Sequence, residues 1–279
     1  MKTVNFEQFK AEVHKAVLTG NKNARIKYQS ATLRYCETYK AWEIRENDLL
    51  HCEWGPAMIY SDGTQEWYYF DNLHRTNGPA VIYPDGRQEW YCMGRRHRED
   101  GPAQIYPDGR QEWWHIGVLH RIDGPARIYP DGRQKWYFMG CEVKENEPQM
   151  LMKEERDFCK YQTDICKNIL IGNKERRIIS NSVCAFGHEK NEHRWVIKCK
   201  SRWHCSWGPA VIYEDGTQMW YYMGELHRED GPAAIYCDGT QEWYYMGKRH
   251  RTDGPAVIHP DGTEEWWYMG QEIKIYRRL

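Results

Sequence analysis

A unit of 23 residues recurs seven times along this chain, and it limits the possible folds more than any other feature of the sequence. One copy reads HREDGPAAIYCDGTQEWYYMGKR, and the copy that follows it reads HRTDGPAVIHPDGTEEWWYMGQE. Self-similarity at this period indicates a repeat architecture, in which stacked neighbours bury what a single unit cannot bury alone. The copies begin at His51, His74, His97, His120, His204, His227 and His250.

Each unit is predicted to form one antiparallel β-hairpin. In the second copy, Pro84-Asp85-Gly86 has the residue order of a type I turn that ends in a left-handed glycine. Such a turn pairs Tyr83 with Arg87, and the return strand is predicted at residues 88–93. Successive hairpins then continue as a meander.

The predicted register separates two faces of the hairpin. Ala80, Ile82 and Trp90 share one face, and the same residue types occupy these positions in all seven copies. The Val81 position instead accepts Gln104 and Arg127 in other copies. We therefore expect the Ala-Ile-Trp face to be packed and the opposite face to be partly open. That opposite face carries Val81, Tyr83, Glu89, Tyr91 and Met93.

The segments outside the repeats indicate a tandem duplication. Residues 5–19 have the apolar spacing of a helix, residues 25–46 are predicted to form two strands, and residues 156–170 repeat the helical spacing. The predicted fold class is mainly β (α+β), with a helix and two strands before each hairpin meander. The expected order is a helix–strand module at 1–50, four repeats at 51–142, a charged linker at 143–155, a second module at 156–203, three repeats at 204–272 and a tail at 273–279.

Composition narrows the functional classes. The 39 basic residues nearly balance the 40 acidic ones, which disfavours a broad electrostatic grip on nucleic acid. The chain has 14 Trp and 20 Tyr but only 6 Phe, a balance typical of half-exposed sheets and binding faces. Because no segment approaches 18 apolar residues and no signal peptide is evident, we expect no membrane insertion, a cytoplasmic location and free thiols.

The run EWYYMGKRHRTDGPAVIHPDG resembles a MORN-type repeat, which also has about 23 residues, an aromatic strand, a Gly-x-x-His connection and a strand closing in Tyr-Pro-Asp-Gly. It is also similar to the bacterial variant in YwqK-type antitoxin-like proteins and to proteins of phages and giant viruses. The HRxDGPA connection departs from the usual short Gly-x-Gly form and indicates a distinct subfamily. The resemblance covers residues 51–142 and 204–272. It implies a hairpin array used for protein contacts, dimerisation or lipid contact, and it implies no catalytic residues.

A His-Arg pair opens most copies and has two interpretations. A row of such pairs can bind phosphates or acidic side chains. Alternatively, each His anchors its own connection and each Arg pairs with the nearby Asp, which the recurrence of the pair favours. Adjacent His side chains are predicted to lie roughly 10 Å apart, too far to share a metal ion. The pairs are His74 with Arg75, His97 with Arg98, His120 with Arg121, His227 with Arg228, and His250 with Arg251.

Two further rows of side chains are candidates for a binding surface. An arginine follows the turn in three copies of the first half, near Tyr83 and its counterparts, and a threonine replaces it in the second half. An aromatic row runs beside it. These residue types receive acidic partners, stack on bases or occur at interfaces. The alternatives are a solvated turn with each Arg paired to a neighbouring Glu, and an aromatic row covered by the other half or a helix. The candidate partner-binding residues are Tyr83, Tyr91, Tyr106, Trp114, Tyr137, Arg87, Arg110 and Arg133.

A weak zinc candidate lies in the second helix–strand module. Cys184, His188, His193 and Cys199 are the right ligand types, but their spacing is not a double CxxC and the first half has no matching set. No nucleophile constellation, phosphate loop or carboxylate pair is evident. We therefore expect a protein that is not an enzyme and needs no cofactor.

The sequence favours a non-enzymatic binding or scaffold protein that engages or sequesters a protein partner. If the viral resemblance holds, the partner is a host factor and the location is the host cytoplasm. The alternative is a nucleotide or nucleic-acid binding protein that stacks bases on Tyr and Trp and holds phosphates with His-Arg pairs. A third hypothesis is self-association through the aromatic row.

Overall fold

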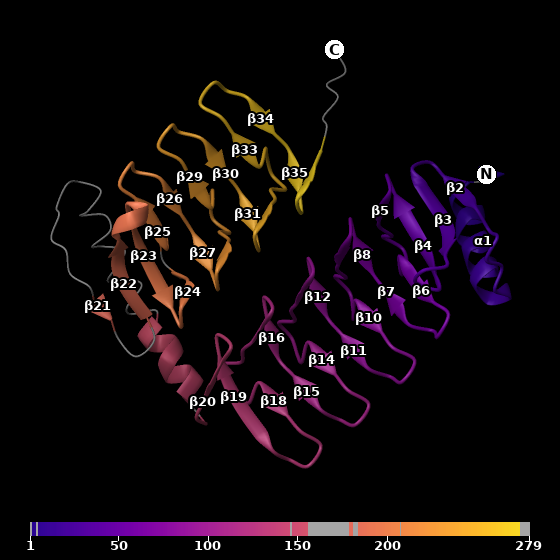
Figure 1. The fold of residues 1–279 in the computed structure, drawn as a ribbon, viewed down its shortest axis with the longest axis horizontal. Coiled ribbons are helices and arrows are strands. Elements are labelled where there is room, and N and C mark those ends of the chain that lie inside the picture. Colours follow the sequence, from indigo (N-terminus) through magenta and orange to yellow (C-terminus); the bar gives the residue numbers. More distant parts are fainter. Residues whose placement is uncertain are drawn as a thin grey trace. The chain divides into compact units, whose positions relative to one another are not determined.

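The computed structural model describes residues 2–3, 5–145, 147–155, 179–180, 184–206 and 208–273. They belong to two compact units, Met1–Gly140 and Cys141–Leu279. Each unit is built mainly from antiparallel hairpins that follow one another along a sheet (Figure 1), which confirms the mainly β fold class. In the described part of the chain, no helix has both the length and the apolar character needed to cross a membrane.

Unit 1 begins with a helix that covers the first strands of its sheet. Helix α1 (Phe6–Thr19) is capped by Asn5, whose side chain accepts a hydrogen bond from the Gln8 backbone amide. The Gln8 side chain accepts one from the Asn5 backbone amide, which completes a capping box. Its buried face packs into a cluster with residues of β2, β3 and β4. This module confirms the predicted helix, but residues 25–46 form three strands and not the predicted two, because the first predicted strand folds back at Gln29-Ser30 as a hairpin. Its strands are β1 (Lys2–Thr3), β2 (Ile26–Tyr28), β3 (Ala31–Cys36), β4 (Ala41–Glu46) and β5 (Leu49–Leu50).

The repeats of unit 1 extend this sheet in chain order, so that each hairpin pairs with the next. In the second copy, Ile82 lies opposite Gln88 and the Tyr83 amide donates to the Arg87 carbonyl, which confirms the predicted register. The main-sheet strands are β6 (Met58–Tyr60), β7 (Gln65–Glu66), β10 (Val81–Ile82), β11 (Gln88–Glu89), β14 (Gln104–Ile105), β15 (Gln111–Glu112), β18 (Arg127–Ile128), β19 (Gln134–Phe138) and then β20 (Cys141–Val143).

Most repeats contain a second, shorter hairpin, so the prediction of one return strand over residues 88–93 is wrong. The return strand ends at Glu89, and β12 (Tyr91–Cys92) then pairs with β13 (Arg95–Arg96). The turn between them, Met93-Gly94, has φ values of 49° and 82°, the two positive values of a type I′ turn. The equivalent strands in unit 1 are β8 (Tyr68–Tyr69), β9 (Asn72–Leu73), β16 (Trp114–His115) and β17 (Val118–Leu119).

Unit 2 repeats the arrangement after a helical segment. Residues 147–155 are helical, so the linker interpretation of 143–155 is wrong for them; Pro148 is tolerated near a helix start, and Leu151 and Glu155 are buried. The helix predicted at 156–170 and most of the predicted tail lie outside the described residues. The elements that follow are β21 (Ile179–Ser180), β22 (Cys184–Glu189), η1 (Lys190–Glu192), β23 (Arg194–Cys199) and β24 (Arg202–Trp203).

The three repeats of unit 2 continue its sheet from β23. They have the same pair of hairpins in each copy as the repeats of unit 1. The main-sheet strands are β25 (Val211–Tyr213), β26 (Gln218–Met219), β29 (Ala234–Ile235), β30 (Gln241–Glu242), β33 (Val257–Ile258) and β34 (Glu264–Glu265). The shorter hairpins are β27 (Tyr221–Tyr222) with β28 (Glu225–Leu226), β31 (Tyr244–Tyr245) with β32 (Lys248–Arg249), and β35 (Trp267–Tyr268) with β36 (Gln271–Glu272).

The sequence predicted a packed Ala-Ile-Trp face and a partly open opposite face for each hairpin, and the observed burial of side chains differs from this. Ala80 and Val81 lie on opposite faces, yet both are buried, and Met93 is buried as well. The expected open face is therefore closed at Val81, and Gln104 is only 3% exposed there. Gln104 is accommodated because its amide donates to Glu89 Oε1 at 2.7 Å. At Gln104 the variation thus reflects a matched polar partner, whereas Arg127 at the same position has both a partner, Glu112 at 2.9 Å, and a side chain that is 24% exposed.

Candidate functional site

The candidate site is a strip of side chains on the Val81 face of unit 1. Because Tyr83 pairs with Arg87 and Val81 lies opposite Glu89, these residues project from the same side of the sheet. Each following repeat adds an equivalent set two strands further along. We call this surface the binding strip, and it comprises Tyr83, Arg87, Glu89, Tyr91, Tyr106, Arg110, Glu112, Trp114, Tyr129, Arg133 and Tyr137.

A row of buried carboxylates forms the floor of the binding strip. Glu89 is 2% exposed and accepts hydrogen bonds from Tyr91 Oη (2.8 Å), Arg96 Nη2 (3.2 Å) and the Gln104 amide. In the next repeat, Glu112 accepts from Trp114 Nε1 at 3.1 Å.

These hydrogen bonds fix the aromatic side chains of the row. Burial, together with the hydrogen bond to Glu89, raises the pKa of Tyr91, so the phenol stays neutral and remains a donor. Burial also raises the pKa of Glu66, which accepts from Tyr68 in the first repeat. The polar tips of the aromatic row are therefore satisfied inside the chain, and the half-buried rings have little freedom left to lose on binding.

Two arginines of the binding strip lie flat on tyrosine rings. Arg87 Cζ is 3.6 Å from the centre of the Tyr83 ring, and Arg110 Cζ is 3.5 Å from that of Tyr106. Their Nε atoms are 3.7 and 3.9 Å from Glu89 and Glu112, beyond hydrogen-bonding distance. Among the described residues, neither Nε has a hydrogen-bond partner. Arg87 and Arg110 thus form the ion pairs with neighbouring glutamates that the solvated-turn alternative predicts, but without a hydrogen bond at Nε.

The third arginine of the row is arranged differently. Arg133 Cζ lies 4.8 Å from the centre of the Tyr129 ring, and its Nε donates to Asp131 at 2.6 Å. The side chain of Arg133 is 72% exposed, whereas those of Arg87 and Arg110 are about one-third exposed. The predicted stripe of three arginines is thus two stacked guanidinium groups followed by one that is paired in its own turn.

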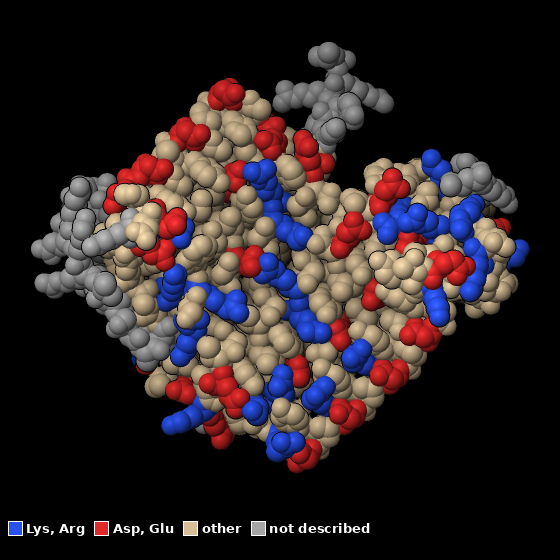
Figure 2. Space-filling model, viewed as in Figure 1, with Lys and Arg blue, Asp and Glu red and all other residues tan. Residues whose placement is uncertain are grey.

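Unit 2 has no equivalent of the arginine row. Thr217, Thr240 and Thr263 occupy its positions, and the Thr217 hydroxyl accepts from the Cys237 amide at 3.1 Å. In Figure 2 the hairpin tips of β25–β26, β29–β30 and β33–β34 show acidic side chains, whereas basic and acidic side chains alternate along the tips of unit 1. The basic part of the predicted surface is therefore a feature of unit 1.

The His-Arg pairs are occupied inside the chain, as the second interpretation of them predicts. His97 Nδ1 accepts from the backbone amide of Ile116, the first residue of the next short turn, at 3.4 Å. Arg98 lies over Trp90, with Cζ 4.2 Å from the ring centre, and donates to Asp100 at 2.7 Å. The same His contact recurs at His74, His120, His204, His227 and His250, and the same Arg stacking at Arg75, Arg121, Arg228 and Arg251.

The zinc candidate is wrong. Cys184 and Cys199 lie opposite each other in the hairpin of β22 and β23, and a disulfide joins them. His188 and His193 instead contact Glu214, at 3.0 and 3.3 Å. No metal-binding cluster of His, Cys, Asp or Glu occurs among the described residues. The expectation of free thiols also fails for this pair, while six other described cysteines are free.

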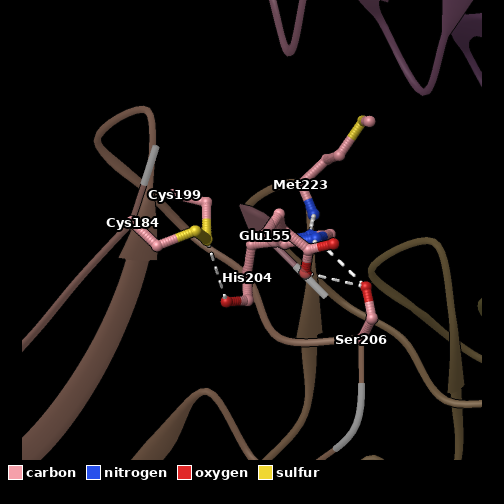
Figure 3. Close-up of a disulfide and its surroundings, with 6 residues drawn as sticks. All are labelled: Glu155, Cys184, Cys199, His204, Ser206 and Met223. Atoms are coloured by element: carbon pink, nitrogen blue, oxygen red, sulfur yellow. Dashed lines mark hydrogen bonds and ion pairs between the residues drawn. A yellow bond between two sulfur atoms is a disulfide. The ribbon is translucent and has the colours of Figure 1, made fainter. Parts of the chain in front are cut away.

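Sequence reasoning missed a buried polar cluster beside this disulfide (Figure 3). Glu155 Oε1 lies 3.0 Å from His204 Nε2 and accepts a hydrogen bond from Ser206 Oγ at 2.9 Å. Glu155, His204 and Ser206 are the residue types of a catalytic triad, but they are not arranged as one. His204 Nδ1 accepts a hydrogen bond from the Met223 amide, so the imidazole proton is on Nε2. Ser206 donates to Glu155 and has no free imidazole nitrogen to accept its proton, so the arrangement is not that of a serine activated by histidine. The cluster instead anchors the 147–155 helix to the first repeat of unit 2.

An open groove of about 660 Å³ lies between the last two repeats of unit 2, beside Trp243, Tyr245 and His250. The arginines on its walls are already paired, Arg228 with Asp230 and Arg251 with Asp253. The groove therefore offers a ligand fewer unsatisfied donors than the binding strip.

The fold and the binding strip define a β-hairpin repeat protein whose distinctive chemistry is on unit 1. No protein-family model matches the chain, and no curated protein matches it either.

Proposed function

We propose that this chain is a non-enzymatic binding or scaffold protein that engages a partner protein through the binding strip of unit 1. The observation that carries the proposal is the pair of stacked guanidinium groups, Arg87 on Tyr83 and Arg110 on Tyr106. Stacking fixes each cation in place, while Nε lacks a hydrogen-bond partner among the described residues. Arg, Tyr and Trp are the residues most enriched at the energetic centres of interfaces.

Nucleic-acid binding is the alternative, and the charge pattern favours it less. The chain has a net charge of -1, and buried Glu89 and Glu112 sit beside the two stacked arginines. A polyanion lying along the strip would meet these carboxylates at each repeat, whereas a protein segment can present isolated acidic groups. Three parts of the proposal are suggested by the sequence alone: the MORN-type resemblance, a host factor as the partner and a cytoplasmic location.

The test compares two equivalent tryptophans. Trp114 donates to Glu112 in the binding strip, and Trp267 donates to Glu265 in unit 2. Trp114→Ala and Trp267→Ala remove the same side chain from matched positions, so a general loss of stability affects both. The wild-type chain and both variants are used to capture partners from a nuclease-treated lysate, followed by cross-linking mass spectrometry.

We expect a protein that is lost with Trp114→Ala, is retained with Trp267→Ala and cross-links to unit 1. Equal loss with both variants, or capture that depends on nucleic acid, contradicts the proposal. A strip that serves self-association instead gives cross-links between copies of this chain and a dimer in light scattering that Trp114→Ala dissociates.

A further inference from the structure

The spacing of the stacked arginines suggests the shape of the segment that binds them. Arg87 precedes β11 and Arg110 precedes β15, and β14 lies between these strands in the sheet. Neighbouring strands are about 4.8 Å apart, so the two arginines present their guanidinium groups roughly 9.6 Å apart, along a line that crosses the strands.

The chemistry of the two sites is that of a carboxylate receptor. A guanidinium group held flat against a ring still presents its N–H edge, which matches the two oxygens of a carboxylate. The side chains of Arg87 and Arg110 are 31% and 32% exposed, but both Nε atoms are buried, so the accessible N–H edge is that of the two terminal Nη groups. Glu89 accepts hydrogen bonds from Tyr91, Arg96 and Gln104 and forms an ion pair with Arg87 Nε at 3.7 Å, which leaves the Nη groups of Arg87 to an external acceptor.

The distance between the two arginines indicates the backbone conformation of the bound segment, because each regular conformation places side chains on one face at its own spacing. A polyproline II helix has three residues per turn and a rise of about 3.1 Å, so every third side chain lies on one face about 9.3 Å from the last. A β-strand places same-face side chains about 6.7 or 13 Å apart, which does not fit. An α-helix offers about 10.5 Å at a spacing of seven residues, a poorer match. Tyrosine-rich surfaces also suit proline-rich segments.

We propose that Arg87 and Arg110 bind two carboxylates, three residues apart, in an acidic and proline-rich segment of a partner protein that crosses the strands in the polyproline II conformation. The inference deepens the proposed function and rests on it. Tyr83 and Tyr106 hold the arginines in position, and the aromatic row beside them packs against the prolines. Arg133 contributes less, because it is paired with Asp131.

Peptide binding to the full chain, measured by fluorescence anisotropy, tests this inference. The probe is a labelled peptide of repeated Glu-Pro-Pro, and its comparators are repeated Gln-Pro-Pro, a proline-rich peptide with Glu at every fourth position, a helical peptide with Glu at every seventh, and single-stranded DNA. We expect the period-three acidic peptide to bind best. Arg87→Gln and Arg110→Gln should each weaken it about tenfold, the effect of losing a hydrogen bond to a charged group.

Two further variants separate charge from geometry. Arg133→Gln removes the same charge from the fourth repeat and should weaken binding less than about threefold, since that arginine is already paired. Arg87→Lys keeps the charge but loses the planar fork and should behave like Arg87→Gln. Unfolding midpoints of all variants show whether a loss of binding is a loss of fold.

The outcomes are distinct. Equal binding of the period-three and period-four peptides, or no effect of Arg87→Gln, overturns the inference. Best binding by the helical peptide overturns the polyproline II conformation, and DNA binding that Arg87→Gln abolishes overturns the carboxylate assignment. If no peptide binds while Trp114-dependent capture of a protein persists, this inference fails and the proposed function stands.

Discussion

The hydrogen-bond network around Glu89 predicts how substitutions of Glu89 and its partners change stability. A repeat of unit 2 shows which residues can replace them. Glu89 accepts from Tyr91, Arg96 and Gln104, as described above. In the first repeat of unit 2, the positions that Glu89, Arg96 and Gln104 hold in the 23-residue unit are taken by three apolar residues. They are Met219, Leu226 and Ala234, and the register of Met219 with Ala234 matches that of Glu89 with Gln104. The fold thus accepts a polar or an apolar set at these positions, and mixed sets also occur, such as Glu242 and Arg249 with Val257.

The size of the change in the free energy of unfolding depends on which side chains lose a hydrogen-bond partner. Glu89→Met leaves Arg96 and the buried Gln104 amide without their acceptor. Breaking a buried ion pair from one side costs about 3–5 kcal/mol of the free energy of unfolding. Arg96 is 34% exposed and can recruit water, so we expect the lower end, about 3 kcal/mol. Adding Arg96→Leu and Gln104→Ala removes two of the unpaired donors, and the third, Tyr91, can contact the introduced sulfur as Tyr221 contacts Met219 Sδ at 3.9 Å. The triple variant should therefore lie within about 1 kcal/mol of the wild type.

Urea unfolding of the full chain, followed by tryptophan fluorescence, measures these differences, and native-state hydrogen exchange at residues 91–96 assigns them to the repeat. Glu265→Met is the control: Glu265 is 31% exposed, so its loss should cost less than about 1 kcal/mol. A triple variant no more stable than Glu89→Met would refute the reasoning, because the cost would then come from the missing carboxylate and not from its unpaired partners.

Three further predictions concern stability. Burial lowers the pKa of His97, so below a pH of about 6.5 the unfolded state takes up the proton first and stability falls; His97→Asn, which keeps an acceptor for Ile116, should flatten this dependence between pH 7.5 and 5.5 in urea titrations. Gly109→Ala should cost about 1–2 kcal/mol through its φ of 90° alone, since no atom lies within 4 Å of the added Cβ, and calorimetry should show a lowered melting temperature. Reducing the Cys184–Cys199 disulfide should cost about 3 kcal/mol in the unfolding of unit 2, and an unchanged urea midpoint after reduction would contradict this.

The sequence predicted the main hairpin well because its turn chemistry is local. Pro84-Asp85-Gly86 allows few pairings, and the observed register is the one this turn imposes. The shorter hairpin was missed for the complementary reason. Its type I′ turn places Met93 at a positive φ where Asn is usual, so only Gly94 of the usual Asn-Gly turn signal was present. The methionine is accommodated there because its side chain is buried and its amide donates to His74.

Long-range pairing limited the rest of the prediction. The disulfide follows from the register of β22 against β23, which places Cys184 opposite Cys199, and no repeat fixes that register. The cluster of Glu155 with His204 joins residues far apart in sequence, from a segment that resembled a linker. The aromatic and arginine rows were found because repetition shows them, but only the structure distinguishes Arg87, which is stacked, from Arg133, which is paired.

The repeats of unit 1 have stacked arginines where those of unit 2 have threonines, which indicates that the hairpin fold does not require the arginines. In unit 1 the Arg87 amide donates to Asp85 at 2.9 Å, and in unit 2 the Thr217 amide donates to Asp215 at 2.8 Å. The turn is therefore equally satisfied with either side chain, and the strand that follows has the same register in both. An arginine that the turn does not require still incurs the cost of ordering a long side chain on Tyr83 and of partial burial with Nε unpaired among the described residues. Under the proposed function, a ligand that accepts hydrogen bonds from the exposed Nη groups would offset the cost of ordering this side chain.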